Sequence, residues 1–191
     1  TMRNPPIFPA RFSNGLLAAP GVYPNPLALI SEESGYNRNS SNYFLSNFQV
    51  VQQIPGVEGL SIKGVLAFDR NFNYNKIWNQ WVPLYIRNAD GTYTVSAQSK
   101  SSLSKGYGEG QGLELQGHIN YDRRFGKHGI SALALVLQKE NQGTGIYGAR
   151  NSYESSALQI LNFGPALNEV LSDGESKTAL RSAAFRLNYD F

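Results

Sequence analysis

Hydrophobic and polar residues alternate with a period of two along much of the chain. The pattern is clearest from Leu60 to Tyr74, where the even positions are apolar and the odd positions are mostly polar, and only Arg70 interrupts the apolar side. Similar alternation runs over residues 42–54, 113–121 and 178–191. Because successive side chains of a β-strand point to opposite faces, this period predicts long strands with one apolar and one polar face.

The segments between these strands divide the chain into six parts. Six of the nine prolines fall within residues 1–41, so we expect neither a helix nor a central strand there. The predicted order is a loop over 1–41, a hairpin over 42–74, a loop with a small hairpin over 75–105, a hairpin over 106–140, a loop over 141–176 and a strand over 177–191. The predicted fold class is all-β, an antiparallel meander of about five long strands.

The connections between the strands alternate in length. Pro55–Gly59 and Phe125–Gly129 read as tight turns, whereas the three loops are long. Outer-membrane barrels combine brief periplasmic turns with extended extracellular loops, and their strands span the bilayer with about 10 residues. We therefore interpret the chain as part of a large transmembrane β-barrel, with its three long loops outside the cell.

Five strands of this length would leave two open sheet edges, which lipid does not tolerate. The chain is therefore expected to be a fragment of a longer barrel. One strand is ambiguous, because residues 132–137 are apolar on both sides. We favour Leu133, Leu135 and Leu137 as its lipid-facing residues.

Composition excludes several other classes of protein. The chain has no cysteine, so disulfide frameworks and thiolate chemistry are absent. Its net charge of +3 is small and its basic residues are scattered, which argues against a nucleic-acid partner. No apolar run approaches the roughly 18 residues of a membrane helix, but the mean hydropathy of -0.35 is compatible with strands that are apolar on one face only.

The strongest candidates for ligand contact are aromatic. Trp78, Trp81 and Tyr85 fall in the second predicted loop, and exposed aromatic rings suit stacking on sugar rings or on apolar peptide side chains. The alternative is that these rings pack the loop against the barrel rim, which large aromatic residues do more often.

Other patterns do not support an enzyme, a cofactor or a metal. Glycines at 106, 108, 110 and 112 follow a period of two, which fits a smooth strand face and not a phosphate-binding loop. Asp69, Glu114 and Asp122 fall on polar strand faces, where we expect them to hydrate a barrel interior and pair with Arg124 or Arg186. His118 and His128 have no second ligand at metal spacing.

Four segments together resemble the middle of the barrel of SusC/RagA-type TonB-dependent outer-membrane transporters. They are residues 25–36, Leu60–Asp69, Ile119–His128 and Arg186–Phe191. Each is a weak barrel signature, but their order and spacing are more specific, and the resemblance covers nearly the whole chain.

The resemblance implies a parent barrel of 22 strands, plugged by an N-terminal domain and located in the bacterial outer membrane. It also implies coupling to TonB, a SusD/RagB-like surface lipoprotein as partner, and a glycan or peptide as imported substrate. Two alternatives remain open from the residues alone. One is a passive porin-like barrel, and the other is a soluble all-β carbohydrate-binding module.

Overall fold

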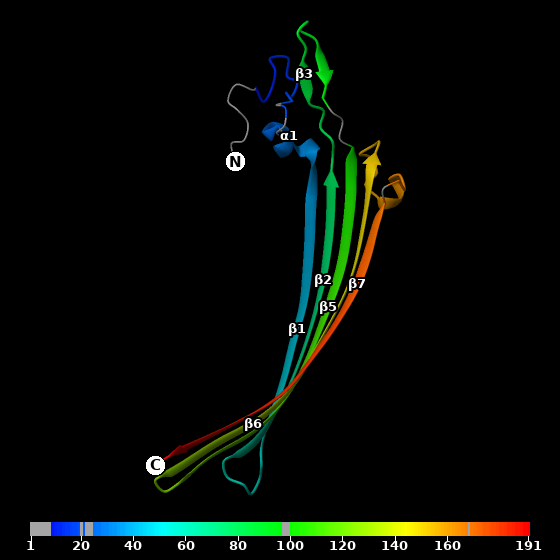
Figure 1. Ribbon diagram of the computed structural model, residues 1–191. Coiled ribbons are helices and arrows are strands. Elements are labelled where there is room, and N and C mark those ends of the chain that lie inside the picture. Colours follow the sequence, from blue (N-terminus) through cyan, green and yellow to red (C-terminus); the bar gives the residue numbers. More distant parts are fainter. Residues whose placement is uncertain (1–8, 20, 22–24, 97–99, 168) are drawn as a thin grey trace. The chain divides into compact units, whose positions relative to one another are not determined.

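In a computed structural model, five long strands form one antiparallel sheet, in which the neighbours follow one another along the chain (Figure 1). The structure describes residues 9–19, 21, 25–96, 100–167 and 169–191. The strands are β1 (Gly35–Gln53), β2 (Leu60–Asn79), β5 (Ser101–Phe125), β6 (His128–Tyr153) and β7 (Val170–Asp190), in the order β1-β2-β5-β6-β7. The predicted all-β meander of five long strands is confirmed.

The chain divides into two compact units that separate the two kinds of connection. The strand unit comprises Ser40–Tyr74, Tyr107–Ile146 and Asp173–Phe191, and it contains the two tight turns. The loop unit comprises Thr1–Asn39, Asn75–Gly106 and Tyr147–Ser172, and it contains the long connections. The predicted alternation of short turns and long loops is therefore present in the structure.

The turn between β5 and β6 has only two residues, Gly126 and Lys127. Gly126 has a φ of +60°. A two-residue hairpin turn requires a positive φ at its first loop position, and glycine adopts such a φ more readily than other residues. This turn joins neighbouring antiparallel strands directly and so fixes their pairing.

The strands extend further than the sequence pattern predicts. β1 begins at Gly35, inside the predicted loop 1–41, and β6 continues to Tyr153, inside the predicted loop 141–176. β2 and β5 likewise extend into the predicted loop 75–105. These extensions are rich in Asn, Ser and Gly on both faces, so no hydrophobic alternation marks them in the sequence.

The expectation of no helix before residue 41 is also wrong. A short helix, α1, spans Pro26–Ile30, and a 3-10 turn, η1, spans Glu32–Ser34. Pro26 occupies the first helical turn, where its missing N–H costs nothing, and the Asn25 side chain accepts a hydrogen bond from the Leu27 N–H at 2.9 Å. Five other prolines led to the same expectation, and those at positions 5, 6, 20 and 24 lie outside the described residues.

The small hairpin predicted in the second loop is present as β3 (Tyr85–Arg87) and β4 (Tyr93–Val95). The Thr92 hydroxyl and then the Thr92 backbone N–H donate hydrogen bonds to the Asp90 carboxylate, and they lower the pKa of this group below its ordinary value. Gly91 supplies a φ of +85° in the same turn. The expected boundary at Ala97 lies outside the described residues.

Among the described residues, no helix has both the length and the apolar character needed to cross a bilayer.

Candidate functional site

The candidate site is the strand unit itself, because its sheet has two chemically different faces. The first, which we call the apolar face, carries the even positions of β1, β2 and β6 and the odd positions of β5 and β7. Phe44 and Phe68 meet on it with ring centroids 6.4 Å apart, and a Cβ at Gly117 would lie 3.2 Å from Val136 Cγ2. His128 Nδ1 lies 2.6 Å from the Tyr189 hydroxyl, which extends the face to β7.

The opposite, polar face is defined by a separate set of contacts. Lys139 Nζ lies 3.5 Å from Glu114 Oε2, which joins β6 to β5. A Cβ added at Gly112 would lie 3.3 Å from Asn141 Oδ1, and the Asn141 side-chain amide contacts the Thr178 hydroxyl at 3.5 Å. Charged and amide groups thus follow one another across three strands.

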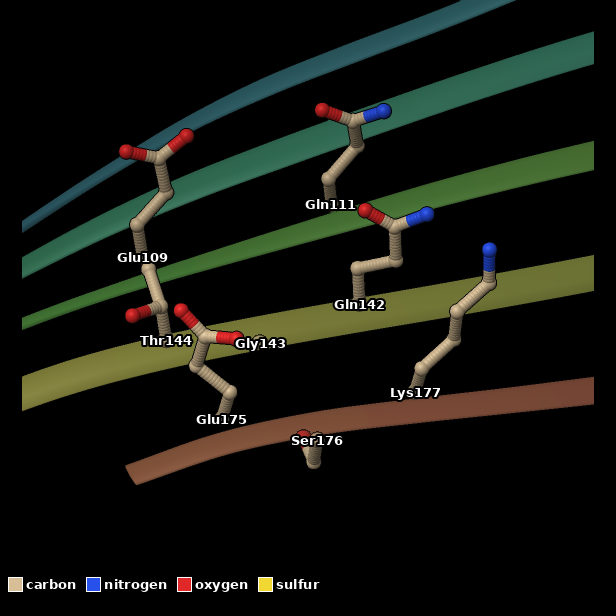
Figure 2. A pocket seen from close by; sticks show the side chains of 8 residues that line it. All are labelled: Glu109, Gln111, Gln142, Gly143, Thr144, Glu175, Ser176 and Lys177. Atoms are coloured by element: carbon tan, nitrogen blue, oxygen red, sulfur yellow. The ribbon is translucent and has the colours of Figure 1, made fainter. Parts of the chain in front are cut away.

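The apolar face changes character part of the way along each strand. On β2 it is apolar over the nine residues from Leu60 to Phe68, and then Arg70 pairs with Glu109 of β5 through Nε and Oε1 at 2.8 Å. Figure 2 shows the polar side chains that follow on β5, β6 and β7 around an open cleft of 450 Å³: Glu109, Gln111, Gln142, Thr144, Glu175 and Lys177. An apolar zone and a polar zone therefore share one face.

The side chains of the apolar zone are exposed or half-buried in this chain. Ile119 is 52% exposed and Phe185 is 71% exposed, and no hydrophobic residue of the strand unit, which is described in full, is buried. An exposed apolar surface of this extent indicates that something apolar covers it.

The structure places Leu133, Leu135 and Leu137 on the polar face. The prediction that these leucines are the lipid-facing residues of their strand is therefore wrong. Val136 lies on the apolar face opposite Gly117, and Lys139 lies on the polar face beside Glu114. Strand alternation then places the three leucines on the polar face. A run that is apolar on both sides carries no periodic signal, and only the neighbouring strands determine its register.

A glycine-floored groove of 430 Å³ crosses the polar face. Its walls include Asn71 and Asn73 of β2 and Ser176 of β7, and Gly108, Gly110, Gly143 and Gly174 leave it open. A Cβ at Gly110 would overlap the Asn71 side-chain amide, so glycine at this position allows the Asn71 side chain to lie directly against the β5 backbone. The groove offers amide and hydroxyl groups that can hydrogen-bond a polar ligand.

The acidic and histidine side chains of the strand unit contact different partners on its two faces. Glu114 pairs with Lys139, and not with Arg124 or Arg186 as the sequence suggested. His118 Nε2 lies 2.9 Å from Gln116 Oε1, whereas His128 contacts Tyr189 on the other face. Within the described residues, no group of three His, Asp or Glu side chains is placed to hold a metal ion.

Trp78 lies in the core of the loop unit. It is 1% exposed, and its ring meets the edge of the Tyr153 ring at a centroid distance of 5.2 Å. Leu103 is fully buried in the same cluster, and Tyr36 and Leu161 pack against it. In this structure the Trp78 ring packs the loop unit together and leaves almost no surface for a ligand.

A single left-handed residue directs Tyr153 toward this cluster. Ser152 has a φ of +69°, which breaks the alternation of β6. Arg150 and Tyr153, three positions apart, consequently both reach the next segment: Arg150 Nη1 donates to the Gly164 carbonyl at 2.9 Å, and the Tyr153 hydroxyl donates to the Ile160 carbonyl at 3.0 Å. Nothing in the sequence pattern indicates this shift.

Trp81 and Tyr85 occupy different settings in the loop unit. Trp81 is half-buried and lines an open cleft of 420 Å³ with Lys100, Tyr153 and Glu154. The Tyr85 backbone is held between Leu17 and Ala19, with both hydrogen bonds at 2.8 Å. Of the three aromatic candidates, Trp81 is the one that the structure places at the wall of this cleft.

Comparison with known proteins gives a likeness of fold. No family model and no curated protein matches the sequence. Similar solved structures include the RagAB peptide importer in the 'closed-closed' state, the RagAB peptide transporter and the RagAB peptide importer in the 'open-open' state, with TM-scores of 0.61, 0.62 and 0.63. Each is 19% identical to this chain, and the match covers 81% of this chain and 16% of the other. The five-stranded sheet is therefore similar in fold to a minor portion of the RagAB transporter structures.

Proposed function

We propose that the chain forms part of the barrel wall of a bacterial outer-membrane importer that depends on TonB and takes up peptides or oligosaccharides. The strand unit would cross the membrane, and the loop unit would contribute to substrate capture outside the cell. A SusD/RagB-like lipoprotein and TonB would be the protein partners. The chain itself supplies no catalytic step.

The observation that carries the proposal is the division of the strand unit into an apolar and a polar face. The stretch from Leu60 to Phe68, nine residues with five positions on the apolar face, extends about 30 Å at 3.3 Å per residue. With the tilt of 35–45° that is usual in barrels, this length corresponds to about 21–25 Å along the membrane normal, close to the apolar band of outer-membrane proteins. Arg70 and Glu109 begin the polar zone where such a band would end.

Two further observations support the same function. The fold likeness to structures described as a peptide importer agrees with the sequence resemblance to TonB-dependent transporters. The polar face, with its glycine-floored groove, has the character of a surface that lines an aqueous lumen. Trp81 in its cleft is the aromatic side chain that we propose for substrate contact.

The test is uptake of labelled oligopeptides and oligosaccharides by cells that carry the full-length parent protein. We expect uptake of one substrate class to require the protein and to stop when a protonophore collapses the proton-motive force, because TonB transmits that force. Trp81→Ala should lower uptake at limiting substrate several-fold, while Phe163→Ala, at an exposed ring of the loop unit that does not line this cleft, serves as the matched control. Uptake that persists without the proton-motive force would indicate a passive porin. Recovery of the protein outside the membrane fraction would favour the soluble module.

A further inference from the structure

A groove of 670 Å³ lies on the apolar face across β5, β6 and β7. Six side-chain positions of this face line it, and they are Leu115, Gly117, Val136, Gln138, Arg181 and Ala183. Its size is within the range of about 300–1,000 Å³ that is typical of small-molecule sites.

The groove exists because two of its positions are small. Gly117 has no side chain, and a Cβ there would lie 3.2 Å from Val136 Cγ2, so that methyl group forms one wall. Ala183 leaves space on β7, and Leu115 on β5 is 45% exposed. The hollow is therefore lined by hydrocarbon over most of its length.

One end of the groove is cationic. Arg181 lines it from β7, and no ion pair of Arg181 is found among the described residues. Gln138, which also lines the groove, donates a hydrogen bond to Glu140 at 2.9 Å. Arg181 thus offers a guanidinium group at the border of an apolar hollow. This arrangement suits a lipid that carries both a phosphate group and an acyl chain.

We propose that this groove binds one anionic membrane lipid, with an acyl chain over Gly117 and Ala183 and the phosphate on Arg181. The inference rests on the proposed function, because it requires the apolar face to lie in a membrane. Charge complementarity and position select the occupant: Arg181 marks the change from apolar to polar residues on β7, where a lipid phosphate would lie above the hydrocarbon.

The test is native mass spectrometry of the full-length parent protein in detergent with phosphatidylglycerol or phosphatidylcholine added. We expect binding of phosphatidylglycerol to exceed that of phosphatidylcholine, and Arg181→Gln to reduce the preference about fivefold, the usual effect of one cation near an anionic surface. Arg181→Lys should keep most of the preference. Ala183→Phe should weaken binding of both lipids, because it fills the acyl site.

Arg186→Gln is the matched control, since Arg186 lies on the same strand but on the polar face. An equal loss of preference in Arg186→Gln and Arg181→Gln would overturn the proposed site, as would an unchanged preference in Arg181→Gln. Failure of the wild-type protein to require detergent or lipid at all would instead contradict the proposed function, so the two failures are distinguishable.

Discussion

Ile119→Lys is expected to destabilise the membrane-embedded protein by about 2–4 kcal/mol, the cost of a lysine on the lipid face of a barrel near the midplane. Ile119 lies on the apolar face of β5, within the apolar stretch that begins at Leu113, and it is 52% exposed. The measurement is the free energy of unfolding from urea titration of the full-length protein in lipid vesicles.

Asn120→Lys provides the control for this prediction. Asn120 is the next residue of the same strand, but it lies on the polar face. A lysine there stays in water and should change the free energy of unfolding by less than about 1 kcal/mol. Equal costs for the two substitutions would contradict the assignment of the faces.

Gly59→Ala is expected to cost at least about 3 kcal/mol and to disturb the pairing of β2 with β5. Gly59 has a φ of +84°, and a left-handed conformation costs about 1–2 kcal/mol for a residue with a Cβ. In addition, the new Cβ would lie 2.9 Å from the Asp122 carbonyl carbon and closer still to its oxygen. The Gly59 carbonyl accepts the Asp122 N–H at 2.9 Å, so relief of the overlap would strain this hydrogen bond. Denaturant unfolding measures the effect.

Gly56→Ala separates the two contributions. Gly56 lies in the same turn with the same φ of +84°, but nothing lies within 4 Å of the place where its Cβ would be. Only the conformational cost of about 1–2 kcal/mol should remain. If both variants lose the same stability, the close approach of Gly59 to Asp122 is not what requires glycine there.

The sequence predicts the strands and turns well because their signals are local. Turn residues such as Gly126 determine the conformation of the backbone near them. The period-two pattern from Leu60 to Phe68 arises because one face of the strand is apolar and the other is mostly polar. The two short turns account for the pairing of β1 with β2 and of β5 with β6, since antiparallel neighbours are joined directly there. The small hairpin around Gly91 was predictable for the same reason.

Features that depend on neighbouring strands could not be predicted. The face of Leu135 is evident only from neighbouring strands, as in the contact of Lys139 with Glu114, and the partner of Arg70 is a glutamate 39 positions away. Trp78 is buried because Ser152 shifts the alternation of β6 and brings Tyr153 over it. The ends of the strands are polar on both faces, so the hydrophobic pattern stops before the hydrogen-bonded strand does.

The accessibility of single cysteines along β5 in the membrane tests directly whether the apolar face lies against lipid. This chain contains no native cysteine, so spin labels can be introduced one at a time from Leu113 to Asp122 in a cysteine-free form of the full-length protein. Collisions with oxygen, which concentrates in lipid, and with a water-soluble nickel complex are measured by electron paramagnetic resonance.

We expect oxygen accessibility to peak at the odd positions and nickel accessibility to peak at the even positions, in opposite phase. Labels at the odd positions that are shielded from both reagents would mean that protein covers the apolar face, and this result would contradict a lipid-facing wall.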